Sequence, residues 1–179
     1  MRKTLGRAAL AALVAGTLEV AEDEAAGARV RVLFSAHGLP LKIVAAGDPY
    51  PSQIASTAAA VVSALARPGL DWRVCFQSRV GPLAWLGPSV EEELDRAGRE
   101  GVRIVVAPIA FVSEHSETLV ELDRDYRRLA ETHGVPAYHR VPTVGTDRRF
   151  IAALAELVRE TEHPAGRTEA AAARAGTNS

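Results

Sequence analysis

Histidine and carboxylate side chains recur in two stretches that lie far apart along the chain. His37 belongs to the stretch LFSAHGLP, and Glu117 belongs to FVSEHSETLVELDRDY at 111–126. Two further acids, Glu121 and Asp125, follow Glu117 at intervals of four residues. An imidazole together with carboxylates suits a divalent metal such as Fe²⁺, and the imidazole can accept a proton near neutral pH. These residue types point to a site that handles a metal ion and protons.

The spacing of the acids decides where they lie if residues 116–133 form a helix. At about 100° per residue, positions 117, 121 and 125 fall within an arc of about 80°. The opposite arc is apolar and is expected to pack on the sheet; it consists of Leu119, Leu122, Tyr126, Leu129 and Ala130. A solvated face, neutralised by arginines of the same helix, is the interpretation that this pattern alone favours. The alternative is a row of carboxylates that bind a passing cation weakly, one after another.

The elements that must position these residues alternate between strands and helices. Apolar, β-branched runs predict strands at 30–34, 71–76, 102–112 and 135–141. Helices are expected at 51–66, 89–100, 116–133 and 147–160, and Ser89 and Glu92 form a capping box for the second of these. This order predicts one Rossmann-like, chelatase-like α/β domain, with an open parallel four-stranded sheet flanked by helices.

The predicted topology brings the two chemical stretches together. Ligands of open α/β sheets bind beyond the carboxyl ends of the strands. His37 follows the first predicted strand, whereas Glu114, His115 and Glu117 follow the third. We therefore expect His37 and Glu117 to meet at one edge of the sheet. Taken alone, each histidine is explained equally well by a hydrogen bond in a turn.

Composition narrows the classes of function. The chain has 179 residues and a formal net charge of −1, so no overall basic field indicates a nucleic-acid partner. Its single cysteine, Cys75, excludes an internal disulfide and an iron–sulfur cluster built from this chain alone. We expect a cytoplasmic, reducing location. No apolar run reaches the ~20 residues of a transmembrane helix, although peripheral membrane contact stays compatible with the sequence.

The chain divides into three segments. Residues 1–28 are of uncertain origin, and an alanine-rich helix is favoured there over a secretory signal. Residues 29–161 form the α/β domain, and residues 162–179 are expected to be a disordered tail. Within the domain, Trp85 lies in a loop bounded by Gly-Pro pairs, where it is either a core residue or a platform for a flat ligand.

Four blocks of the sequence resemble ferrochelatases. These blocks are LFSAHGLP (33–40), GDPYP (47–51), FQSRVGPLAWLGPS (76–89) and PIAFVSEHSETLVELD (108–123), and they occur in the family's order. The resemblance implies haem biosynthesis, with insertion of Fe²⁺ into protoporphyrin IX and release of two protons. It implies that Fe²⁺ is a substrate and that no cofactor is tightly bound.

The resemblance also implies roles for particular residues. The histidine of the SAHG block and the glutamate of the HSET block fall on His37 and Glu117, which would carry catalysis and metal binding. Glu121 and Asp125 correspond to acids that are implicated in metal passage, and Trp85 matches an aromatic residue near the porphyrin. In the family mechanism a distorted macrocycle points its nitrogens out of plane.

The resemblance is restricted to one of the family's two α/β domains. The porphyrin lies between these domains, and this sequence resembles only the second. We therefore expect weak or no insertion by this chain alone, with the other wall supplied by an N-terminal half or by a second copy of the chain. The alternatives are a coproporphyrin ferrochelatase, a non-catalytic module that binds a tetrapyrrole or a metal, and a generic Rossmann-like binding domain.

Overall fold

A computed structural model describes residues 4–24 and 27–162. Its strands are β1 (Val30–His37), β2 (Asp71–Gln77), β3 (Arg103–Pro108) and β4 (Tyr138–Arg140). Its helices are α1 (Thr4–Asp23), α2 (Leu41–Ala45), α3 (Tyr50–Leu65), α4 (Val90–Glu100), the π-helix η1 (Glu117–Asp125), α5 (Tyr126–Thr132) and α6 (Arg148–Glu162). The tail that was expected to be disordered lies outside the described residues, apart from residue 162.

The four strands form one parallel sheet in the order β2-β1-β3-β4. This confirms the predicted open α/β sheet. Both inner strands are almost fully buried, as expected for parallel strands that are covered on both faces. The capping box is also confirmed, because the Ser89 hydroxyl accepts from the Glu92 amide and the Glu92 carboxylate accepts from the Ser89 amide.

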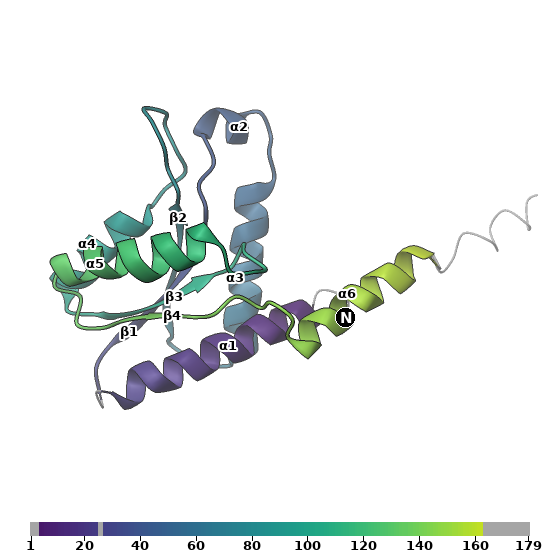
Figure 1. The fold of residues 1–179 in the computed structure, drawn as a ribbon, viewed down its shortest axis with the longest axis horizontal. Coiled ribbons are helices and arrows are strands. Elements are labelled where there is room, and N and C mark those ends of the chain that lie inside the picture. Colours follow the sequence, from purple (N-terminus) through teal and green to yellow (C-terminus); the bar gives the residue numbers. More distant parts are fainter. Residues whose placement is uncertain (1–3, 25–26, 163–179) are drawn as a thin grey trace, which may run out of the picture.

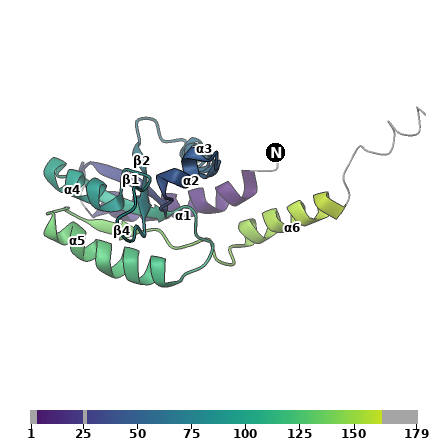
Figure 2. The same cartoon turned by 90° about the horizontal axis from the view of Figure 1, so that it is seen from above.

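Helices cover both faces of the sheet (Figures 1 and 2). Helices α1 and α3 pack on one face, around Val32 and Phe34 of β1. Helices α4 and α5 and the π-helix η1 pack on the other, around Leu33. Successive side chains of a strand point to opposite faces, so Ser35 and His37 share the Leu33 face and look toward η1. The alternation along β1 therefore aims His37 at the helix that carries Glu117.

Helix α1 is part of the main core. Leu10, Val14 and Leu18 are buried in the same apolar cluster as Val32 and Phe34. Helix α6 packs against α1 and then extends away from the sheet (Figure 1). No helix among the described residues has the length and apolarity needed to cross a membrane.

Two strands are shorter than the sequence predicts. The strand that was expected at 102–112 ends at Pro108, because the Phe111 amide donates to the Pro108 carbonyl and closes a turn. The strand that was expected at 135–141 contains only 138–140. Pro136 precedes β4 and Pro142 follows it. A proline has no N–H to donate to a sheet ladder, which limits the length of this edge strand.

The helix that was expected at 116–133 is wound in two ways. Residues 117–125 form η1, with the wider i→i+5 winding, and α5 continues to Thr132 with ordinary α-helical winding. The change in winding rotates Leu119 off the apolar face, so this side chain is 50% exposed while Leu122 is fully buried. The prediction that Leu119 packs on the sheet was therefore wrong.

Candidate active site

The structure brings His37 and Glu117 together at the carboxyl edge of the sheet. His37 is the last residue of β1, and Glu117 is the first residue of η1. The His37 Nδ1 atom lies 2.9 Å from the Glu117 Oε2 atom. Their side chains are 46% and 35% exposed, so the pair is open to a ligand. Eighty residues of sequence separate them, and the parallel sheet closes that gap.

The contact fixes which imidazole nitrogen is basic. A carboxylate only accepts hydrogen bonds, so Nδ1 of His37 donates to Glu117. In a neutral imidazole this leaves the lone pair on Nε2, which can take a proton or a metal ion. Glu117 therefore acts on His37 as carboxylates act on metal-binding histidines, by orienting the ring and fixing its tautomer.

Tyr50 anchors the backbone at His37. Its hydroxyl donates to the His37 carbonyl at 3.1 Å. Burial raises the pKa of Tyr50 above its ordinary value, so the hydroxyl keeps its proton and stays a donor. Tyr50 is the first residue of α3, and no local pattern in the sequence indicates this contact.

Glu121 is held by neutral donors from the end of β2. The Gln77 amide nitrogen lies 2.7 Å from Glu121 Oε2, and the Ser78 hydroxyl lies 2.5 Å from the same oxygen. The Gln77 nitrogen also donates to the Glu117 carbonyl at 2.9 Å. Glu121 therefore points toward the sheet edge rather than along a separate solvated face. Sequence reasoning missed both Gln77 and Ser78, although both directly follow a predicted strand.

The start of η1 is built around His115. The amides of Thr118 and Leu119 both donate to the His115 carbonyl, at 3.1 and 2.8 Å. The His115 Nδ1 atom accepts from the Glu117 amide at 3.2 Å, and its ring meets Phe111 edge-on at 5.0 Å. His115 thus secures the turn from which Glu117 projects.

The other acids near the site are engaged by arginines. Asp125 is 51% exposed, and its carboxylate pairs with the neighbouring Arg124 at 2.8 Å. Arg124 lowers the pKa of Asp125 below its ordinary value through this hydrogen bond. Glu114 pairs with Arg140 at 3.0 Å and accepts from the Thr143 amide. Among the described residues, the Asp125 side chain forms no hydrogen bond or ion pair with His37, Glu117 or Glu121.

Trp85 lies beside the residue that follows His37. A Cβ atom on Gly38 would lie 3.4 Å from the Trp85 ring and 2.9 Å from the Gln77 carbonyl. Glycine is therefore required for the close approach of the two loops. Trp85 and Pro40 form a bridge between these loops, and Nε1 of Trp85 is buried without a hydrogen-bond partner in the described part of the chain.

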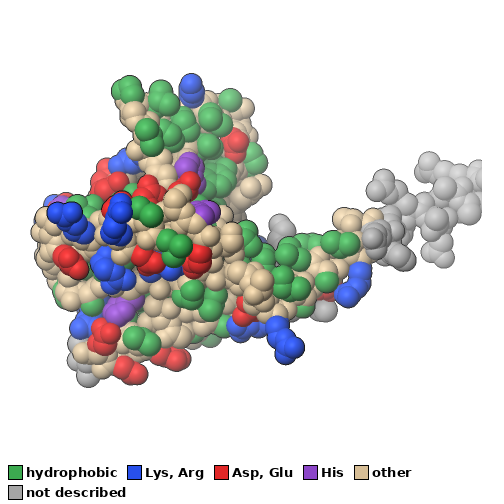
Figure 3. All heavy atoms as spheres, viewed as in Figure 1, with side chains coloured by type: hydrophobic (Ala, Val, Ile, Leu, Met, Phe, Trp, Pro, Cys, Tyr) green, Lys and Arg blue, Asp and Glu red, His purple; other side chains and the backbone are tan. Residues whose placement is uncertain are grey.

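A projecting apolar surface flanks the site. It is formed by α2 and the loop after β2, and its exposed members are Leu41, Ile43, Val80 and Leu83. In Figure 3 hydrophobic side chains cover this projection, and histidine and acidic side chains gather at its base. An apolar wall next to polar groups suits a flat, largely apolar ligand.

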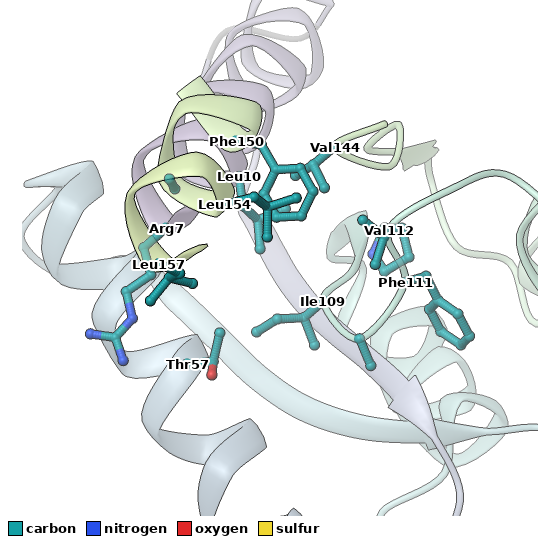
Figure 4. A pocket seen from close by; sticks show the side chains of 13 residues that line it. Arg7, Leu10, Thr57, Ile109, Phe111, Val112, Val144, Phe150, Leu154 and Leu157 are labelled. Carbon is teal, nitrogen blue, oxygen red and sulfur yellow. The ribbon is translucent and has the colours of Figure 1, made fainter. Parts of the chain in front are cut away.

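A separate apolar cavity lies under α6. It has a volume of about 480 Å³ and lies between α6, the first turns of α1 and the loop after β3. Figure 4 shows Phe150, Leu154 and Leu157 of α6 on one side and Ile109 and Val112 on the other. Among the residues that the structure describes, no carboxylate or histidine lines this cavity, so its chemistry differs from that of the His37 site.

The metal-binding capacity of the site is low. Across residues 4–24 and 27–162, no group of three or more His, Cys, Asp and Glu side chains is arranged to hold a metal ion. His37 and Glu117 supply two potential ligands, which is fewer than a tight structural site uses. Such a pair suits a metal ion that passes through and leaves.

The structural comparison supports the fold. SirB from Bacillus subtilis, in a structure with Fe³⁺, matches with a TM-score of 0.53 and 16% identity. The match covers 83% of this chain and 52% of that chain.

The sequence comparisons identify the family. A family model described as Ferrochelatase matches residues 7–162. The ferrochelatase of Caulobacter vibrioides is 55% identical over 132 residues, and that of Phenylobacterium zucineum is 58% identical over 127 residues. The match covers 74% and 71% of this chain, but only 38% and 37% of these relatives. The chain spans well under half the length of the curated relatives it matches, and it belongs to the ferrochelatase family.

Proposed function

We propose that this chain acts in haem biosynthesis and supplies the metal-handling wall of a ferrochelatase that inserts Fe²⁺ into protoporphyrin IX. The contact of 2.9 Å between His37 and Glu117 is the observation that carries the proposal. It joins a proton acceptor to a carboxylate at an exposed edge of the sheet, beside an apolar wall. The family membership supports the reaction class.

Insertion requires that two pyrrole protons leave as the metal enters. His37 accepts these protons one at a time in this proposal, because its Nε2 atom carries a single lone pair when Nδ1 donates to Glu117. Its ring is exposed to water, so it returns the first proton to solvent before it accepts the second. Glu117 stabilises the resulting imidazolium and offers a carboxylate oxygen to the arriving Fe²⁺. The two protons leave the porphyrin and the Fe²⁺ ion enters it at the same place. The two positive charges that enter with the ion balance the two that leave with the protons.

Glu121 and Asp125 supply the route for the metal ion. Glu121 is the nearer stop, because neutral donors hold it and leave its charge available to a cation. Asp125 is the outer stop, at which Fe²⁺ competes with Arg124 for the carboxylate. Trp85, together with the apolar projection beside it, supplies a surface for the porphyrin.

The chain needs a partner surface to enclose a porphyrin. The other wall of the cleft would come from a first α/β domain or from a second copy of this chain. The exposed apolar projection could also rest on a membrane surface from which porphyrin is drawn. The single, buried Cys75 suits a reducing cytoplasm.

A second function is favoured by the one-sided geometry of the site. The described residues place His37, Glu117 and the apolar projection along one exposed surface, which is suited to bind a tetrapyrrole or a metal without completing insertion. Half of a cleft can bind a flat ligand without distorting it. The first candidate predicts metal insertion, and the second predicts binding alone.

An anaerobic insertion assay distinguishes these functions. The purified chain is mixed with Fe²⁺ and either protoporphyrin IX or coproporphyrin, and loss of porphyrin fluorescence is followed alongside a chelator control. We expect insertion well below that of the Caulobacter vibrioides enzyme, with protoporphyrin preferred. Quenching of the fluorescence of Trp72 or Trp85 by porphyrin, without insertion, favours the binding module. Turnover equal to that of the longer enzyme contradicts the need for a second wall.

A further inference from the structure

We propose that Gln77 is a positioning residue that holds Glu117 and Glu121 in the geometry they present to a divalent cation. The proposal rests on the proposed function, because the cation is the metal that these carboxylates would handle. Gln77 is the last residue of β2, and its side chain is completely buried. It donates hydrogen bonds to both Glu117 and Glu121 of η1, whereas its neighbour Ser78 donates only to Glu121.

The hydrogen bonds of Gln77 link three elements. Its amide nitrogen donates to the Glu117 carbonyl at 2.9 Å and to the Glu121 carboxylate at 2.7 Å. Its amide oxygen accepts from the Ser35 hydroxyl at 2.7 Å. Ser35 belongs to β1, two residues before His37, so a single side chain connects the strand of the histidine to the helix of the acids.

The orientation of the amide has one chemically reasonable solution. Both groups that face the nitrogen, the Glu117 carbonyl and the Glu121 carboxylate, are acceptors only. A rotation of the amide by half a turn would place its oxygen against them and would leave the Ser35 hydroxyl facing an N–H group. The nitrogen therefore donates to both acceptors, and the amide oxygen is left to accept from the Ser35 hydroxyl.

The neutrality of Gln77 matters as much as its position. An arginine or a lysine at this place would pair with Glu121 and cancel its charge, as Arg124 does with Asp125. A neutral amide fixes the carboxylate without neutralising it. An apolar residue would fill the same space but would leave the Glu117 carbonyl and a Glu121 oxygen without their donor, which carries a desolvation penalty.

The bond to the Glu117 carbonyl also acts on His37. The Glu117 carbonyl lies in the first turn of the π-helix, where Gln77 links it to the sheet edge. Loss of this link frees the turn from the strand, and the contact between His37 and Glu117 must then compete with other orientations of the helix end. Gln77 therefore influences His37 without touching it.

The test compares Gln77→Leu with the unaltered chain by two measurements. The first is the ¹⁵N chemical shift of His37 Nδ1, which reports its hydrogen bond to Glu117. The second is the affinity for Co²⁺, which is used as the metal probe. We expect the Nδ1 signal of Gln77→Leu to move toward that of Glu117→Gln, and the affinity for Co²⁺ to fall about tenfold, as is usual when a residue that orients metal ligands is lost.

Two control variants separate positioning from general destabilisation. Val61→Ala removes buried volume on the opposite face of the sheet and is expected to lower stability without changing the Nδ1 signal or the affinity for Co²⁺. Ser78→Ala removes a donor to Glu121 only, so it should weaken Co²⁺ binding while the Nδ1 signal stays in place.

The outcomes keep this proposal distinct from the proposed function. An Nδ1 signal that is unchanged in Gln77→Leu overturns the positioning role, whatever happens to Co²⁺. If the signal moves but the unaltered chain binds no Co²⁺, Gln77 does position the pair, and the metal role of the proposed function fails instead. If Val61→Ala moves the signal equally, the effect reflects stability alone, and the proposal is overturned.

Discussion

Two clusters of charged side chains lie at opposite ends of the sheet, and they are held in opposite ways. At the carboxyl end, Glu117 and Glu121 accept hydrogen bonds from His37, Gln77 and Ser78. At the amino end, Arg31 of β1 pairs with Asp71 and Glu100 at 2.7 Å each. Within the residues that the structure describes, no lysine or arginine forms an ion pair with Glu117 or Glu121. In this described part of the chain, the carboxylates of the first cluster have no arginine or lysine partner, whereas those of the second share the guanidinium of Arg31.

The type of donor that holds a carboxylate separates a stabilising role from a functional one in this domain. The side chain of Arg31 is only 5% exposed, and its hydrogen bond to Asp71 raises its pKa above the ordinary value despite the cost of burial. Such a buried cation with two carboxylate partners fixes strand and helix ends. Carboxylates that are held by neutral donors at an exposed edge instead keep the capacity to attract a cation.

Glu114 lies near the site but is held by a charged donor, as the carboxylates at the amino end are. It is three residues from Glu117, yet it is clamped by Arg140 and by the Thr143 amide. Burial alone would raise the pKa of Glu114, but the Thr143 amide and the Arg140 guanidinium outweigh that cost and lower it to about 2. Proximity to the site is therefore a poor guide to role, and the identity of the donor is a better one.

We expect the largest loss of stability from a substitution in the cluster at the amino end of the sheet. Arg31→Leu removes a buried guanidinium and leaves Asp71 and Glu100 without their shared partner, although both can regain water. We expect a loss of about 2 kcal/mol in the free energy of unfolding, or roughly 30-fold in the folding equilibrium. Urea denaturation measures this loss. An unchanged affinity for Co²⁺ in the folded variant is part of the prediction, and a large fall would contradict it.

At the carboxyl end of the sheet, we expect substitutions to change the affinity for a metal ion rather than the free energy of unfolding. Glu121→Gln keeps the size of the side chain but removes the charge that Gln77 and Ser78 hold toward the sheet edge. We expect the affinity for Co²⁺ to fall about tenfold, with little change in the midpoint of urea denaturation. Calorimetric titration tests the affinity. Full affinity in this variant would remove Glu121 from the metal route.

Glu114 should show a stability effect that depends on pH. Its folded-state pKa lies below the unfolded value, so its contribution is present above about pH 4.5 and is lost as the pH falls toward 2. With screening allowed for a side chain that is one-third exposed, Glu114→Gln should cost about 1 kcal/mol at pH 7 and almost nothing near pH 2. Urea denaturation across this range tests the sign. A cost that persists at pH 2 would contradict it, and Glu131→Gln serves as a surface control.

The smallest effect is expected at Asp125. Because Arg124 already engages this exposed carboxylate, Asp125→Asn should change the affinity for Co²⁺ by less than about twofold. The same titration that follows Glu121→Gln measures it. A loss equal to that of Glu121→Gln would show that the outer acid is as important as the inner one.

Sequence patterns predicted most of the fold. The parallel sheet followed from four apolar runs that alternate with helical segments, and the meeting of His37 with Glu117 followed from the position of both after strands. Parallel strands end at the same edge of the sheet, so strand direction alone predicts that His37 and Glu117 lie close together. The family resemblance named the same two residues independently.

The remaining features depend on contacts that no local pattern encodes. The π-helical winding of η1 begins at Glu117, after the loop that follows β3, and it turns Leu119 away from the apolar face to which α-helical periodicity assigned it. Gln77 and Tyr50 reach the site from other elements, and their partners are 40 and 13 residues away. Only the packed fold reveals such long-range hydrogen bonds.

The most direct test of the account uses a chimaera. In it, residues 29–161 of this chain replace the matching segment of the Caulobacter vibrioides ferrochelatase, which provides a second wall for the porphyrin. We predict Fe²⁺ insertion into protoporphyrin IX by the chimaera, and a loss of at least about 100-fold in kcat when either His37→Ala or Glu117→Ala is introduced. Near-normal turnover in both variants would contradict the central claim that this pair performs the proton and metal transfer.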